Sequence, residues 1–76
     1  MKEKRQYNFS KLRGKMRELN KTNKDMADML NVSETTFSYK LNNIRPFTNE
    51  ELDLIIENLG ILPFEINQYF FTKIVE

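Results

Sequence analysis

Seventy-six residues suffice for one small domain, whose core is marginal in size. The sequence contains no cysteine and no histidine, so disulfides, thiolate chemistry, the commonest metal ligands and the commonest general base are absent. We therefore expect no metal, no cofactor, no small-molecule ligand and no enzymatic activity. No segment approaches the roughly 20 apolar residues of a membrane span, and the charged start does not resemble a signal peptide. A soluble cytoplasmic protein is expected.

Charge is distributed unevenly along the chain. Residues 1–24 hold nine Lys and Arg against two acidic residues, whereas residues 25–76 hold three against nine, so the net charge of +1 conceals a basic and an acidic part. Local potential, rather than net charge, attracts nucleic acid. The segregation favours DNA binding, although a charged, solvated surface also accounts for the counts.

Residues 1–7 show no hydrophobic periodicity and predict a flexible basic arm ahead of a single domain over residues 8–76. Three basic side chains of this arm, Lys2, Lys4 and Arg5, are suited to a phosphate backbone or a minor groove. A disordered terminus without a role is the alternative.

A first helix is predicted from Phe9 to about Leu19, because apolar residues recur there at helical spacing and Asn8 can cap it. The apolar residues are Phe9, Leu12, Met16 and Leu19. Gly14 lies in the middle of this helix, at a cost of about 1 kcal/mol relative to alanine. The close approach of a neighbouring element would explain the glycine.

Two short helices joined by a tight turn are predicted within residues 22–42, where Thr22 can cap the first. Their apolar positions are Met26, Ala27, Leu30, Phe37 and Leu41, with Ile44 continuing the second face. Asn31 tolerates left-handed backbone and Ser33 is a strong N-cap, which suits the turn between the helices. Ala27 is small, as two closely approaching helices require.

This arrangement resembles the helix-turn-helix of the Cro and lambda-repressor-like family, in which the second helix enters the DNA major groove. The matching residues are Asn23, Ala27, Leu30, Asn31, Val32, Ser33, Phe37 and Asn42. The resemblance covers about residues 8–70 and implies an all-α, five-helix, lambda-repressor-like DNA-binding domain. Lys40 departs from it, at a usually aliphatic position. Met16 and Leu41 stand where many relatives carry an Arg-Glu pair, and we expect these two side chains to contact each other.

Candidates for contact with DNA lie on and around the second helix of the motif. Its polar side chains, which suit base edges, are Glu34, Thr35, Ser38 and Tyr39. Any amphipathic helix has a polar face, however, and Glu34 also suits the helix dipole. By resemblance and charge, phosphate contacts are expected from Thr22, Asn23, Lys40, Asn42 and Arg45.

A fourth helix is predicted between the capping box of Thr48 and Glu51 and a terminating Gly60. Its acidic face is interpreted as solvated, since no partner for catalysis or metal binding accompanies it. Pro63 opens a fifth helix, and residues 63–76 are dense in apolar side chains. We predict a homodimer formed by Phe64, Ile66, Tyr69, Phe70 and Ile74, with docking of this segment on the core as the alternative.

Together these features predict a sequence-specific transcriptional regulator, a Cro-like phage repressor that occupies double-stranded operator DNA as a dimer in the bacterial cytoplasm. No second, effector domain is expected at this length. The alternative is a protein-binding module, such as an antitoxin or an antirepressor, built on the same fold.

Overall fold

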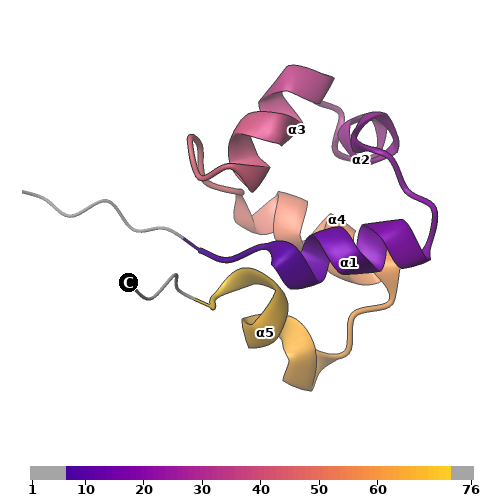
Figure 1. The fold of residues 1–76 in the computed structure, drawn as a ribbon, viewed down its shortest axis with the longest axis vertical. Coiled ribbons are helices and arrows are strands. Elements are labelled where there is room, and N and C mark those ends of the chain that lie inside the picture. The colour runs from indigo at the N-terminus through magenta and orange to yellow at the C-terminus, as the bar shows by residue number, and fades with distance from the viewer. Residues whose placement is uncertain (1–6, 73–76) are drawn as a thin grey trace, which may run out of the picture.

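The computed structural model describes residues 7–72, which form five α-helices and one 3₁₀ turn (Figure 1). The helices are α1 (Ser10–Glu18), α2 (Asn23–Leu30), α3 (Glu34–Leu41), α4 (Asn49–Leu59) and α5 (Ile66–Phe70), and the 3₁₀ turn η1 (Pro63–Glu65) leads into α5. Over these residues the only β-type pairing is an isolated bridge at Tyr7. The predicted all-α, five-helix fold is confirmed. None of the described helices is long and apolar enough to cross a membrane.

Side-chain caps fix where three of the helices begin. Thr22, Ser33 and Thr48 each accept a hydrogen bond from the backbone N–H three residues further on. At α2 and α4 the bond is reciprocated, because the carboxylates of Asp25 and Glu51 accept from the N–H of Thr22 and Thr48. These local bonds explain why the predicted starts of α2, α3 and α4 agree with the structure.

Left-handed residues end α2 and α4. Asn31 closes α2 at φ 58° and Gly60 closes α4 at φ 66°, as their positions in the sequence predict. At the start of α1 the N-cap is Phe9, one residue later than predicted, although Asn8 Oδ1 still accepts from the Ser10 N–H at 2.9 Å. Gly14 has no close neighbour: a β-carbon there would meet nothing within 4 Å.

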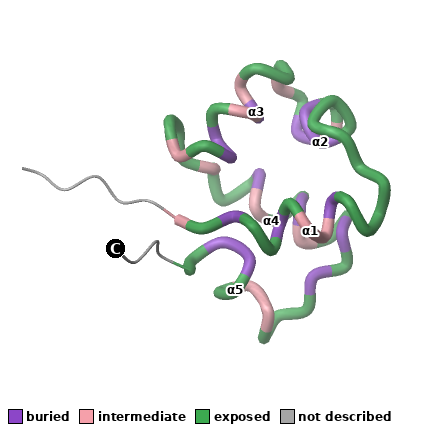
Figure 2. Tube along the Cα trace, in the orientation of Figure 1, coloured by how far each residue is buried: buried purple, intermediate pink, exposed green. Residues whose placement is uncertain are grey.

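One core is shared by all five helices (Figure 2). Its largest fully buried side chains are Phe37, Phe70, Leu12, Met26 and Ile55. Phe47, in the loop between α3 and α4, packs edge-on against the rings of Phe9, Phe37 and Phe70, with centroids 5.4, 6.1 and 6.4 Å away. The loop after α3 is therefore tied into the core by an aromatic cluster.

The predicted dimer surface is wrong in part. Tyr69 and Phe70 are only 5% and 2% exposed, because the short helix α5 packs against α1 and buries its apolar face in that contact. Ile66 is half-buried, whereas Phe64, in η1, is 77% exposed. Ile74 lies outside the described residues. Of the residues assigned to the dimer, Phe64 is thus the one that the structure leaves well exposed.

Tyr7 is not part of a free arm. Its N–H donates to Asn43 Oδ1 at 2.8 Å, and Asn43 Nδ2 donates to the Tyr7 carbonyl at 2.9 Å. Beside it, the Asn8 N–H donates to the Thr72 carbonyl, so both ends of the described chain meet near the loop that follows α3. The rest of the predicted arm, residues 1–6, lies outside the described residues.

Candidate nucleic-acid interface

Helix α3 presents the polar face that the sequence predicts. Phe37 and Leu41 point into the core, being 0% and 5% exposed. On the outer side Glu34 and Thr35 are exposed, Tyr39 is 40% exposed, and Ser38 is half-buried. With α2, this helix forms one end of the molecule, opposite α5 (Figure 1). The outer face of α3 is therefore exposed at Glu34, Thr35 and Tyr39.

A polar hollow of about 310 Å³ lies between α1 and the C-terminal half of α3. Its lining residues are Arg13, Met16, Arg17, Lys21, Thr22, Asn23, Ser38, Leu41 and Asn42. Three of them are basic and none is acidic, so the hollow suits an anion such as phosphate. It gathers the predicted phosphate contacts Thr22, Asn23 and Asn42 in one place. Met16 and Leu41, each 5% exposed, are buried as predicted, and both line this hollow.

Arg13, which the sequence analysis did not single out, organises one wall of this hollow. Its guanidinium donates to the Leu41 carbonyl at 3.3 Å and to Asn42 Oδ1 at 3.2 Å. Asn42 Nδ2 in turn donates to the Ser38 carbonyl at 2.9 Å. The available signal was spacing: Arg13 precedes Met16 by three residues on α1, and Met16 was expected to face Leu41.

The start of α2 forms another wall. The Thr22 N–H donates to Asp25 at 2.9 Å, and this bond, assisted by the Thr22 hydroxyl, lowers the pKa of the Asp25 carboxyl. Asp25 therefore stays ionised at neutral pH and satisfies one N–H of the first turn. The negative charge of Asp25 is not among the groups that line the hollow.

Lys40 is not a phosphate contact, contrary to the sequence-based prediction. The residue is 7% exposed, and its Nζ donates to Glu51 Oε1 at 2.5 Å and to the Pro46 carbonyl at 3.3 Å. Helical spacing explains this, since Lys40 follows the buried Phe37 by three residues and shares its face. The charge is directed inward, toward Glu51 of α4. This residue was predicted to belong both to a capping box and to a solvated acidic face, and the second prediction is wrong for Glu51, which is 8% exposed.

The surroundings of Glu51 favour its ionised form. Burial by itself would raise the pKa of Glu51, but the hydrogen bonds from Lys40 Nζ and the Thr48 N–H outweigh that effect and hold the pKa below its usual value. Glu51 is 8% exposed, so it links α3 to α4 away from solvent.

Arg45, another predicted phosphate contact, is exposed. It follows α3 in an exposed loop and pairs with no carboxylate of residues 7–72. A guanidinium in such a position, next to the end of α3, is suited to binding an anion.

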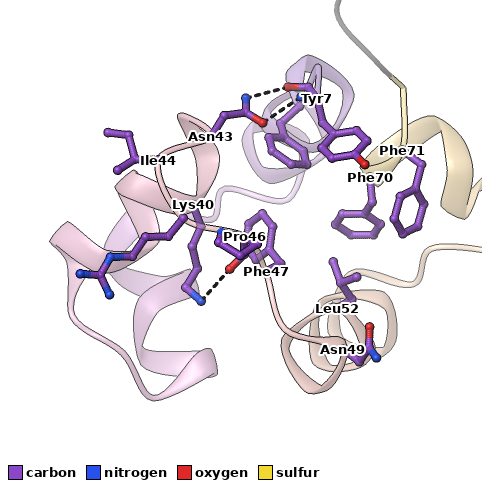
Figure 3. A pocket seen from close by; sticks show the side chains of 12 residues that line it. Tyr7, Lys40, Asn43, Ile44, Pro46, Phe47, Asn49, Leu52, Phe70 and Phe71 are labelled. Atoms are coloured by element: carbon purple, nitrogen blue, oxygen red, sulfur yellow. Dashed lines mark hydrogen bonds between the residues drawn. The ribbon is translucent and has the colours of Figure 1, made fainter. Parts of the chain in front are cut away.

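An apolar groove of about 480 Å³ lies beside the same loop (Figure 3). Figure 3 shows the rings of Tyr7, Phe70 and Phe71 on one side of it, with Leu52 and Asn49 of α4 below. Two of its apolar side chains, Ile44 and Phe71, are 56% and 48% exposed. Exposed apolar groups around a concave surface suit contact with another protein.

Residues 5–73 match the family model described as a protein of unknown function, DUF739. The chain is also similar to the solution structure of the modulator of repression (MOR) of the temperate bacteriophage TP901-1 from Lactococcus lactis, with 33% identity and a TM-score of 0.68. That similarity covers 86% of this chain and 88% of the other. A search of curated proteins found no match. With most of its length matched, the chain belongs to the DUF739 family.

Proposed function

We propose that this protein is a DNA-binding transcriptional regulator of the kind that acts in phage repression circuits, and that α3 enters the major groove. The observation that carries the proposal is one continuous surface. The outer face of α3 adjoins the basic hollow, and Ser38 and Asn42 belong to the end of α3 and to the hollow at once. Similarity to a phage modulator of repression supports the regulatory setting.

In this proposal each part of the surface has its own task. Thr35 and Tyr39 contact base edges, with Glu34 and Ser38 beside them. The hollow, through Arg17, Lys21 and the start of α2, holds one phosphate, and Arg45 holds another. Two copies bind an inverted repeat with half-sites about 10 base pairs apart, and the exposed Phe64 contributes to their contact.

The test begins with the selection of bound sequences from a random DNA pool. Thr35→Ala and Tyr39→Ala should each cost about 1–3 kcal/mol on the selected site and leave random DNA nearly unaffected. Arg45→Ala should weaken both DNAs about equally and reduce the salt slope by about one. If Tyr39→Ala lowers both affinities in parallel while Arg45→Ala changes base preference, the orientation of α3 in the groove is wrong.

A second candidate function is binding to a partner regulatory protein. The apolar groove with its exposed Ile44 and Phe71 favours it, and so does the description of the similar phage protein as a modulator of repression. The same selection separates the two functions. If no DNA sequence is enriched from the pool and neither Tyr39→Ala nor Arg45→Ala changes any DNA affinity, partner binding replaces DNA binding as the function.

A further inference from the structure

The two ends of α3 are held in different ways. Of the described helices, α2 lies closest along α3, joined to it by the tight turn at Asn31. The C-terminal turn of α3 and the two residues after it are instead tied to three other parts of the chain. These ties are Arg13 of α1 to Leu41 and Asn42, Lys40 to Glu51 of α4, and Asn43 to the backbone of Tyr7. The angle of α3 therefore depends on them.

Arg13 satisfies groups that the end of a helix leaves open. The Leu41 carbonyl belongs to the last turn of α3, where carbonyls have no intrahelical partner and where a positive charge is favourable. Arg13 donates to it at 3.3 Å and also to Asn42 Oδ1 at 3.2 Å. The Asn42 amide then reaches back to the Ser38 carbonyl at 2.9 Å. One guanidinium thus fixes the side-chain orientation of Asn42, a predicted phosphate contact, and the end of α3 that precedes it.

The same guanidinium borders the phosphate site. Arg13 lines the basic hollow together with Arg17 and Lys21, and it also lines a smaller hollow beside Tyr7 and Asn8. A guanidinium carries five donors in a rigid planar fork, whereas the ammonium of lysine is a point charge. Both bonds to α3 leave from a single nitrogen of Arg13, so further donors remain for an anion in the hollow.

We propose that Arg13 is a positioning residue for base discrimination: it sets the angle of α3 and the orientation of Asn42 while a phosphate occupies the hollow. The inference rests on the proposed function. It distinguishes Arg13 from Arg17, which lines the same hollow and carries the same charge, but forms no hydrogen bond to α3 within the described residues.

Three variants test this on the selected site and on random DNA. Arg17→Ala removes charge alone, so it should weaken both DNAs by similar factors. Arg13→Lys keeps the charge and loses the fork, so random DNA should be bound within about twofold of normal while the ratio of specific to random affinity falls roughly tenfold. Arg13→Ala should show both losses. The inference is overturned if Arg13→Lys leaves the ratio unchanged, or if Arg13→Ala and Arg17→Ala behave alike.

A measurement on the free protein separates this inference from DNA binding. The N–H groups of Asn42 and Asn43 donate to the carbonyls of Ser38 and Lys40, at 3.0 and 3.3 Å. Arg13→Lys should speed their hydrogen exchange, whereas Arg17→Ala should not, and the Phe37 N–H at the other end of α3 should stay unchanged in both. If hydrogen exchange at Asn42 and Asn43 is unchanged in Arg13→Lys, the inference is overturned, regardless of the DNA affinities of the variants. If exchange is faster in Arg13→Lys but the protein binds no DNA, Arg13 still holds the C-terminal end of α3, and the proposed function is refuted.

Discussion

Replacing Lys40 with methionine should destabilise the fold strongly, because it removes one partner of a buried ion pair and leaves the other. The linear stem of Lys40 is replaced by one of similar volume, so little cavity is created. Removing one member of a buried pair costs about 3–5 kcal/mol. We expect about 3 kcal/mol, the lower end of that range, since the Thr48 N–H still donates to Glu51. For a domain of this size the loss corresponds to a fall in Tm of about 12–24 °C.

Urea denaturation followed by circular dichroism measures this loss of unfolding free energy. The matched control is Lys24→Met, whose pair with Asp28 at 3.5 Å is 72% and 69% exposed and should contribute less than about 0.5 kcal/mol. The double variant Lys40→Met with Glu51→Gln should recover much of the loss, because glutamine is neutral and still accepts from Thr48. If Lys40→Met falls within about 0.5 kcal/mol of the Lys24 control, the pair is not buried as described.

Three further substitutions test the core, the helices and the loss of unfolding free energy at acidic pH, which is called the acid limb below. Gly14→Ala should stabilise by about 0.5–1 kcal/mol, since a β-carbon meets nothing within 4 Å, and a loss of stability in denaturation would contradict that open space. Leu41→Ala should cost about 2–5 kcal/mol, and an unchanged Tm would argue against its burial. Because the pKa of Glu51 is lowered from its ordinary 4.5, its contribution is complete above that pH and is lost as the pH falls through the folded value. Glu51→Gln should flatten this acid limb, and an unaltered limb would contradict the pairing.

The fold was predictable from sequence where its determinants are local. Caps such as Thr22 and Ser33 act within three residues, and left-handed Asn31 and Gly60 act on their own backbone, so the helix boundaries follow from short stretches of sequence. The exposed face of α3 followed in the same way from helical spacing.

The site was less predictable where a side chain has a distant partner. Lys40 and Glu51 are eleven residues apart on different helices, and Glu51 already had a sufficient local role as a cap. The prediction that Tyr69 and Phe70 form a dimer surface was wrong for a different reason, because a high density of apolar residues does not distinguish a core face from an interface. In addition, a 3₁₀ turn shifts the start of α5. For Arg13 the spacing from Met16 gave a position near Leu41, but one of its acceptors is a backbone carbonyl, and residue types do not indicate such a bond.

The inward direction of Lys40 reduces the number of cations within residues 7–72 that are available to bind phosphate. Lys15 and Lys24 pair with Glu18 and Asp28, and Lys11 bonds Gln68 at 2.7 Å, beside α5. The cations left near α3 are Arg13, Arg17, Lys21 and Arg45. Three to four phosphate contacts correspond to a slope of roughly −3 to −4 in log affinity against log salt concentration, per protomer.

This slope also reveals whether the basic residues ahead of Tyr7 contribute. Deleting residues 1–6 removes Lys2, Lys4 and Arg5 and should leave the slope of roughly −3 to −4 unchanged if the folded domain supplies all phosphate contacts. Titrations of the full chain and the shortened chain at several salt concentrations measure both slopes. A full-chain slope near −6 that returns to about −3 on deletion would assign three contacts to that segment. A slope near zero in both would mean that phosphate is not bound, and the major-groove proposal would fail with it.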